Sequence, residues 1–351
     1  MAKNSLPRWF VKKYVYLDPQ KELNFFMYDI ISIGSATRDV FIISKEFHIL
    51  SDPHSINHKA ECVSLGSKIE IDQLVLTTGG GGTNTATTFA RLGFKTATIT
   101  RLGDDRPGLD ILEDLNTNRI STRFIKKIKH GQTGYSTLLT MLDGERTILV
   151  YRGVSSLFTS KDILWNKLST KWIYLSSLGG NFALSKKIIE FATKKKIHLA
   201  WNPGKKELES GLKIFLPVLS KINVFMINRE EAQILTGQMQ ANSQKLLNIL
   251  SAYTSGLIII TDGPNGAYAS CQGKNFHVAT TGVKSISQTG AGDAFGSGVV
   301  SGLMKGLLHY QALRVGILNA ESVIQQIGAK KGIISKWPSE KKLKMITLKN
   351  F

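Results

Sequence analysis

Three small residues followed by an aspartate form the segment of this chain best suited to catalysis. Gly290, Ala291 and Gly292 precede Asp293, and an apolar, glycine-spaced run of helical length follows. Small residues at a helix start let a ligand approach the backbone, where free amides and the helix dipole favour an anion. A carboxylate beside an anion site suits phosphoryl transfer to a hydroxyl, because both the developing charge and the departing proton find a partner. The structural alternative is a glycine turn in which Asp293 caps the helix.

A second glycine cluster precedes another helical pattern. Residues 79–82 are four consecutive glycines, which are costly to order. This cost is easier to understand where a substrate must touch the backbone. Asn84 follows in the first helical turn and can both donate and accept hydrogen bonds, as a sugar hydroxyl requires. The alternative is a flexible loop after an edge strand.

Further polar residues follow the ends of predicted strands, where the ligand crevice of a parallel sheet lies. Asp39 follows the first strand by a short turn and could bind paired hydroxyls. Asn228 and Glu231 are three apart at a strand-to-helix junction, so both could meet phosphate or hydrated magnesium. A capping box is the competing interpretation of this pair. Thr261 and Gly263 end another strand and could contact a nucleotide.

The elements that must position these residues alternate between short apolar runs and longer amphipathic ones. This alternation predicts an α/β fold with a parallel sheet covered by helices on both faces. The strands are expected at 29–33, 96–100, 172–175, 198–201, 224–227 and 257–261, and helices at 83–92, 109–115, 183–193, 212–219, 230–235, 244–252, 293–307 and 310–327. Strand-like segments without intervening helices, at about 39–43, 68–76 and 134–151 with a turn at 143–144, predict a small inserted β-sheet that acts as a lid.

Composition is that of a soluble globular protein. The chain has 351 residues, of which 42% are hydrophobic and 20% charged. No apolar run reaches the length of a membrane span, and two distant cysteines favour a reducing cytoplasm. The net charge of +19 is scattered without interleaved aromatic residues, which argues against dedicated nucleic-acid binding. Residues 1–26 are predicted to be a basic extension without a signal-peptide pattern.

Together, the two glycine motifs resemble those of the ribokinase-like (PfkB) family of carbohydrate and nucleoside kinases, over about residues 27–334. The resemblance implies a three-layer α/β/α kinase domain, followed by a tail at 335–351, and a possible homodimer through the lid. It implies ATP and Mg²⁺ as cofactors and a sugar or nucleoside as substrate. The roles it implies are Asp293 as the base; the Gly290, Ala291 and Gly292 amides as the anion hole; Asp39, Gly80, Gly81 and Asn84 as sugar contacts; Asn228 and Glu231 for magnesium and phosphate; and Thr261, Gly263 and Asn319 as nucleotide contacts.

Two departures from the family pattern bear on ligands. Ser287 stands where the family commonly has an aspartate that helps to hold a monovalent cation, which counts against potassium activation. Gly81 stands where ribokinases carry a lysine, which weakens the case for ribose. Our hypothesis is an ATP- and magnesium-dependent kinase for a primary hydroxyl of a sugar. The alternatives are a nucleoside or sugar-phosphate kinase, Arg152 being a candidate phosphate contact, and a non-catalytic sensor on the same fold.

Overall fold

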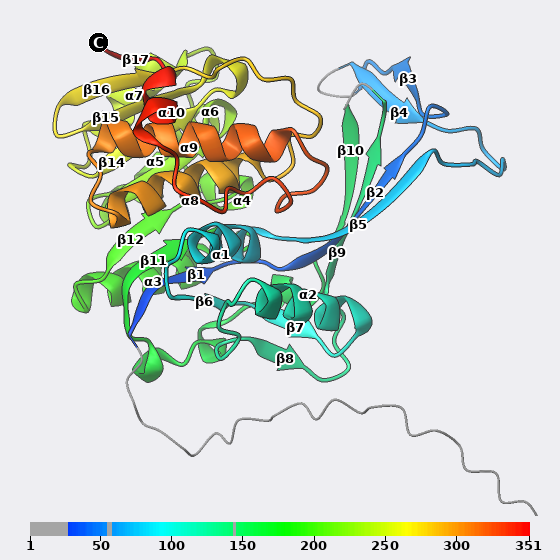
Figure 1. The fold of residues 1–351 in the computed structure, drawn as a ribbon, viewed down its shortest axis with the longest axis horizontal. Helices are drawn as coiled ribbons and strands as arrows, with labels where there is room; N and C mark the ends of the chain where they lie inside the picture. The colour runs from blue at the N-terminus through cyan, green and yellow to red at the C-terminus, as the bar shows by residue number, and fades with distance from the viewer. Residues whose placement is uncertain (1–26, 55–57, 143–144) are drawn as a thin grey trace, which may run out of the picture.

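The computed structural model describes residues 27–54, 58–142 and 145–351; the predicted extension at 1–26 and the turn at 143–144 lie outside them. A nine-stranded sheet forms the centre of the molecule, in the order β17-β16-β15-β14-β13-β12-β11-β1-β6 (Figure 1). Its parallel strands are β1 (Tyr28–Ile33), β6 (Thr96–Ile99), β11 (Thr170–Leu175), β12 (His198–Trp201), β13 (Val224–Asn228) and β14 (Leu257–Thr261). The six predicted buried strands are therefore present.

Alternate residues of these strands enter two separate cores, one on each face of the sheet. Ile31 and Ile173 pack into the first core, whereas Ile30 and Tyr174 pack into the second. The first core is covered by α3 (Phe182–Lys194), α4 (Lys205–Leu208), α5 (Leu212–Leu219), α6 (Arg229–Thr236) and α7 (Ser243–Ser251), and the second by α1 (Gly81–Arg91), α8 (Ala291–Met304) and α9 (His309–Ile324). The predicted three-layer α/β/α architecture is confirmed.

A smaller four-stranded sheet projects from one side of this core (Figure 1). It is ordered β10-β9-β2-β5 and is made from β2 (Thr37–Ile43), β5 (Gln73–Gly79), β9 (Gly134–Thr140) and β10 (Arg146–Tyr151). Strand β2 runs parallel to β9 and antiparallel to β5, which sets Asp39 opposite Ser136 and Thr77. The predicted lid is thus one sheet, whose base carries Asp39.

A helix between the lid strands packs at the base of this sheet. Helix α2 (Arg106–Thr117) begins at Asp105, whose side chain accepts from the Gly108 amide at 3.0 Å and from the Thr133 amide at 2.7 Å. Asp105 is thus the N-cap of this helix, and Pro107 lies in the first turn, where a proline is tolerated. Two short strands, β7 (Arg101–Gly103) and β8 (Lys126–Ile128), and the 3₁₀ helices η1 (Gly153–Leu157), η2 (Ser160–Asp162) and η3 (Trp165–Lys167) complete this region.

Several elements differ from the predictions. The strand predicted at 68–76 begins only at Gln73, and a hairpin of β3 (His48–Ser51) and β4 (Lys59–Cys62) precedes it. Strands β15 (Ala267–Cys271) and β16 (Lys274–Val278), with η4 (Gly263–Asn265) before them, make one edge of the main sheet antiparallel. The predicted tail at 335–351 contains α10 (Glu340–Met345) and β17 (Leu348–Asn350), which pairs with β16. The folded domain therefore continues past residue 334, through segments too short to show a clear period.

None of the helices in the described ranges is long and apolar enough to cross a membrane.

Candidate active site

Helix α8 begins with amides that have no partner. Gly290 precedes the helix in the left-handed conformation, with φ 83°, and no side chain caps the helix. The Ala291 amide donates to the Gln288 carbonyl at 3.2 Å, but no described residue accepts from the amides of Gly290, Gly292 and Asp293. A Cβ on Gly292 would meet nothing within 4 Å, so open space lies beside these donors. Free amides at a helix start favour an anion; here the Asp293 amide is free, whereas the Ala291 amide, predicted as part of an anion hole, is occupied.

The Asp293 side chain lies against the glycine-rich start of α1. Its Oδ2 accepts a hydrogen bond of 2.8 Å from Nδ2 of Asn84, 209 residues away in the sequence. A Cβ on Gly81 would lie 3.4 Å from Asp293 Oδ1 and 2.8 Å from the Ser176 Cβ. The two glycine motifs predicted from the sequence therefore meet at one carboxylate.

Close approaches explain why small residues occupy this junction. Gly80 has φ 94°, which favours glycine, and a Cβ there would lie 2.5 Å from the Ser35 carbonyl oxygen. A Cβ on Gly79 would lie 1.9 Å from Asp39 Oδ2. The glycine cluster is thus packed between the first strand and the two aspartates, which contradicts the interpretation of it as a flexible loop.

Asp39 is a buried carboxylate at the base of the lid. Asp39 is 5% exposed, and its Oδ1 accepts a hydrogen bond of 2.8 Å from the Thr37 hydroxyl. Burial raises the pKa of Asp39, against the lowering effect of hydrogen bonds from Thr37 and Ser136 and of the Lys330 and Arg38 charges. Proton binding to Asp39 is therefore easier than to an ordinary aspartate.

The pKa of Asp293 is raised, like that of Asp39. Burial raises its pKa, the hydrogen bond from Asn84 lowers it, the Asp39 charge raises it further and the Lys330 charge lowers it. The net effect is a raised pKa, which makes Asp293 a better proton acceptor than a solvated aspartate while it stays ionised.

A cavity of about 440 Å³ opens on the other side of the α8 N-terminus. The predicted residues Asn228, Thr261, Gly263, Ala291 and Gly292 all line it. An apolar part is formed by Phe295 of α8 with Ile317, Ala320 and Ile324 of α9. The cavity thus combines the free amides with a surface suited to a planar base.

Asn228 and Glu231 form a capping box at the start of α6. The Asn228 side chain accepts from the Glu231 amide at 2.8 Å, and the Glu231 carboxylate accepts from the Asn228 amide at 2.9 Å. Burial raises the pKa of Glu231, and its hydrogen bond from the Asn228 amide opposes this. The capping interpretation is therefore correct, and it also fixes both side chains at the end of β13, beside the cavity.

Asn319 lies away from this cavity. The residue is fully buried, donates to the Ala294 carbonyl at 2.7 Å and accepts from the Ile334 amide at 3.1 Å. These bonds hold α8, α9 and the following loop together. Asn319 is consequently a structural residue here, and the nucleotide contact implied for it has no support in this arrangement.

Comparison with known proteins agrees with this geometry. The family of pfkB carbohydrate kinases matches residues 27–336. The chain belongs to the pfkB carbohydrate kinase family. Mouse ribokinase is 28% identical over 66% of this chain and 72% of its own length, and the ribokinase of Schizosaccharomyces pombe is 26% identical over 89% and 96%. The structure of Arabidopsis thaliana ribokinase complexed with ribose and ATP is similar with a TM-score of 0.71, at 18% identity over 91% of this chain and 98% of that one. This pfkB-family protein is a carbohydrate kinase with the ribokinase fold.

The two departures from the family pattern have physical consequences in this kinase. Gly81 leaves no room for a side chain, because Ser176 and Asp293 are already in contact distance of a Cβ. Ser287 is buried, and its hydroxyl accepts from the Thr289 amide at 3.4 Å. A neutral hydroxyl thus occupies the place of the family's aspartate.

Three further residues of the site were missed from the sequence. Ser176 directly follows β11, and its buried hydroxyl has no partner among the described residues. Its position after a strand end is the signal by which it could have been predicted. Arg146 at the start of β10 lines the nucleotide-sized cavity, and its Nε is buried without a described partner. Lys330 follows α9, and no motif around it in the sequence marks it as a residue near the site.

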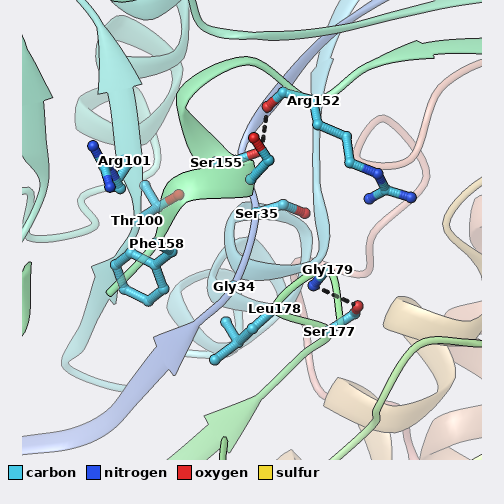
Figure 2. A pocket seen from close by; sticks show the side chains of 11 residues that line it. Gly34, Ser35, Thr100, Arg101, Arg152, Ser155, Phe158, Ser177, Leu178 and Gly179 are labelled. Atoms are coloured by element: carbon cyan, nitrogen blue, oxygen red, sulfur yellow. Dashed lines mark hydrogen bonds between the residues drawn. The ribbon is translucent and has the colours of Figure 1, made fainter. Parts of the chain in front are cut away.

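A second cavity, of about 90 Å³, adjoins the acceptor side (Figure 2). Gly34 is shared by the two sites, because a Cβ there would lie 2.9 Å from the Ser176 Cβ. Thr100 lines the cavity with a buried hydroxyl that has no described partner. Arg152 also lines the cavity, and its guanidinium extends away from Ser155, on the side opposite to Thr100 (Figure 2). This cavity has a mixed polar and apolar lining and includes the exposed Arg152.

Proposed function

We propose that the protein transfers the γ-phosphoryl group of ATP to a primary hydroxyl of a sugar, with Asp293 as general base. The observation that carries this proposal is the 2.8 Å contact between Asn84 and Asp293 beside the free amides of α8. The Asp293 carboxylate accepts the hydroxyl proton, the sugar oxygen forms a bond to phosphorus, and the bond to the ADP oxygen breaks. The amides stabilise charge on the transferring group.

On the acceptor side, the sugar lies against the glycine cluster. Asp39 and Asn84 bind its hydroxyls, and the backbone at Gly80 and Gly81 contacts the ring where no side chain intervenes. The buried Oδ1 of Asn84, which has no described partner, supports this assignment because a sugar hydroxyl would satisfy it.

On the nucleotide side, ATP occupies the cavity lined by Asn228, Thr261 and Gly263. Its phosphates lie toward Gly292, and Arg146 reaches them from the lid. No cluster of three or more potential ligands for a metal occurs among the described residues. A single carboxylate near the phosphates, that of Glu231, fits Mg²⁺, because this ion typically takes one or two carboxylates with waters and substrate phosphates. Glu231 would hold it through water, and the ion would neutralise phosphate charge.

The proposal is tested by an acceptor panel. Purified protein with ATP and Mg²⁺ is offered free sugars, sugar phosphates and nucleosides, and ADP release is measured. We expect ADP release with at least one free sugar. Thermal stabilisation by ligands without ADP release from any acceptor would instead identify a non-catalytic sensor.

A sugar phosphate is the second candidate acceptor, favoured by the cavity in Figure 2. The unpaired Thr100 hydroxyl and the Arg152 guanidinium could bind a phosphate remote from the reacting hydroxyl. Arg101 also lines this cavity, where its Nη1 donates to Asp162 and the Leu157 carbonyl and its buried Nε has no described partner. The substitution Arg152→Gln would raise the KM of a sugar phosphate and leave that of a free sugar unchanged.

A cytoplasmic setting and a homodimer through the lid complete the proposal. Cys62 and Cys271 are free thiols, as a reducing compartment allows. The edge strand β10 exposes apolar side chains on both faces, namely Ile148, Leu149, Val150 and Tyr151. A second copy of the chain would cover them.

A further inference from the structure

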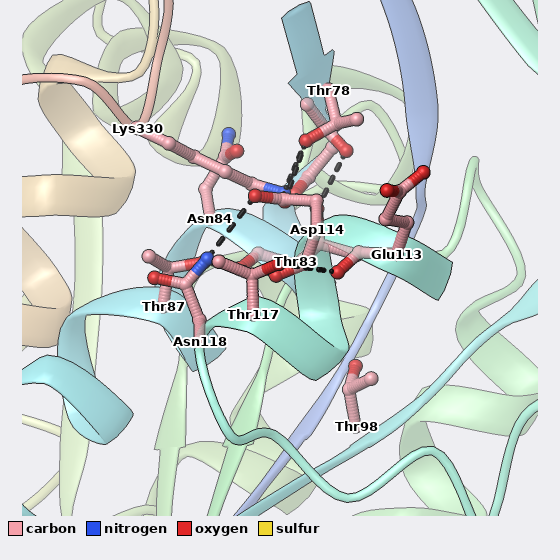
Figure 3. A network of polar contacts seen from close by, with 12 residues as sticks. Thr78, Thr83, Asn84, Thr87, Thr98, Glu113, Asp114, Thr117, Asn118 and Lys330 are labelled. Carbon is pink, nitrogen blue, oxygen red and sulfur yellow. Dashed lines mark hydrogen bonds and ion pairs between the residues drawn. The ribbon is translucent and has the colours of Figure 1, made fainter. Parts of the chain in front are cut away.

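A lysine is buried beside the acceptor site. Lys330, in the loop after α9, is 7% exposed. Its Nζ donates to Asp114 Oδ2 at 2.7 Å and to the Thr78 hydroxyl at 2.9 Å (Figure 3). The Thr78 hydroxyl also donates to Asp114 Oδ2, at 2.7 Å. A buried ion pair is weak evidence for a contribution to stability, because desolvation offsets the attraction. The position of this lysine therefore suggests a role other than stability.

The loop that carries Lys330 is fixed by a second cation. Arg91, the last residue of α1, donates to the carbonyls of Lys330 at 2.8 Å and Ile333 at 3.3 Å. Its Nε donates to Asn118 Oδ1 at 2.9 Å, and Asn118 Nδ2 donates to Asp114 Oδ1 at 3.1 Å. The lysine is thus held at its backbone by α1 and at its ammonium by α2 and β5, so its charge has a fixed position (Figure 3).

This fixed charge contacts neither carboxylate of the proposed acceptor site directly, but it acts on both through space. Thr78 directly precedes Gly79, which is in van der Waals contact with Asp39. The charged groups that act on Asp39 are Lys330 and Arg38, and those that act on Asp293 are Asp39 and Lys330. Burial lowers the pKa of Lys330 below its ordinary value, Asp114 and Asp39 oppose this by favouring the charged ammonium, and Arg91 adds to the lowering. Lys330 is the group common to both site carboxylates.

We propose that Lys330 is a positioning residue of the acceptor site, whose clamped ammonium allows the neighbouring Asp39 and Asp293 side chains to serve the substrate together as two carboxylates. Two like charges that share a site resist ionising together, and one then retains a proton. A protonated Asp293 could not accept the proton of the sugar hydroxyl. The inference rests on the proposed function for its catalytic consequence, but the charge state of the pair can be measured without turnover.

The test compares variants of Lys330 with a matched neighbour. Lys330→Met removes the charge, and Lys330→Gln removes it while keeping a donor for Asp114 and Thr78. Lys330→Arg keeps the charge, and Lys331→Met makes the same charge change at an exposed position. Carboxyl titrations by ¹³C NMR, assigned with Asp39→Asn and Asp293→Asn, report the pair directly, and the pH profile of kcat/KM reports its effect on turnover.

We expect Lys330→Met and Lys330→Gln to raise the titration midpoints of Asp39 and Asp293, and the acid limb of the kcat/KM profile, by about one pH unit. Lys330→Arg and Lys331→Met should keep the midpoints and the acid limb of the wild type. If Lys330→Met fails to fold, Lys330→Gln carries the comparison. Unchanged titration midpoints in a folded neutral variant would overturn the inference. Shifted midpoints in a protein that phosphorylates no acceptor would uphold it and refute the proposed function instead.

Discussion

At the scale of single residues, the account depends on how carboxylates are tuned by their neighbours. Burial raises the pKa values of both Asp39 and Asp293. The ionised form of Asp293 is the one that accepts a proton, so activity should be present above its folded pKa and lost as pH falls through it. The hydrogen bond from Asn84 stabilises this ionised form.

The substitution Asn84→Ala should therefore act in two ways. The acid limb of kcat/KM should move to higher pH, because the ionised Asp293 loses its donor, and the KM of the sugar should rise about tenfold, as expected for a lost hydrogen bond of about 1.4 kcal/mol. Steady-state kinetics from pH 5 to 9 would measure both. Asn248→Ala on the exposed side of α7 is the control. An Asn84→Ala profile that overlays the wild type would remove Asn84 from the site.

At the scale of elements, the start of α8 has one glycine that packs tightly on its neighbours and one that borders open space. Gly290 has φ 83°, and a Cβ there would lie 2.5 Å from the Ala329 Cβ. Gly292 has no atom within 4 Å of its Cβ position, which faces the cavity. The same substitution at these two positions should have opposite consequences.

Gly290→Ala should lower the free energy of unfolding by about 1–3 kcal/mol, through backbone strain and the clash with Ala329. Gly292→Ala should leave stability unchanged or slightly higher, because Ala is the better helix former. Its methyl group should nevertheless obstruct the anion site and lower kcat by at least about tenfold. Urea denaturation and kcat measured on both variants make the comparison. Full activity of Gly292→Ala would contradict the assignment of these amides to the phosphoryl group.

The elements also mark the limit of what the sequence predicts. Buried parallel strands and amphipathic helices were found because continuous apolar runs alternate with amphipathic ones, and the strands place Asn228 and Thr261 at their ends, whereas Asp39 lies within the lid strand β2. Strands β16 and β17 and the β3–β4 hairpin were missed because they are short and largely exposed or half-buried. Strand β15 is mostly buried, but its run of small and polar residues gives no strong apolar signal. Lys330 was missed for another reason: its partners Asp114 and Thr78 are 216 and 252 residues away, and no local pattern encodes such a contact.

At the scale of the whole molecule, the lid sheet exposes apolar side chains along its edge strand β10. Strand β10 lies at an edge of the lid sheet, and Leu149 and Val150, which point to opposite faces, are 55% and 53% exposed. In a homodimer through the lid, Leu149 and Val150 would be buried. The contact would also hold the lid sheet in place over each acceptor site.

Leu149→Asp should therefore convert a dimer into a monomer, because a charge would replace apolar surface in the contact. Sedimentation velocity of the wild type and the variant would measure the mass of each. Leu308→Asp is the control, since Leu308 is 58% exposed at the start of α9, away from the lid. A wild-type protein that sediments as a monomer at all concentrations would exclude this assembly.

The central claim is that Asp293 removes the proton from the acceptor hydroxyl, and turnover of Asp293→Asn tests it most directly. Asn keeps the shape of the side chain but cannot act as a base at neutral pH. We predict a loss in kcat of at least about 100-fold, with ATP binding by calorimetry nearly intact. Thermal stability should be equal or higher, because the raised pKa of Asp293 means that the ionised carboxylate is costly to bury. A folded Asp293→Asn protein that turns over at the wild-type rate would contradict the account.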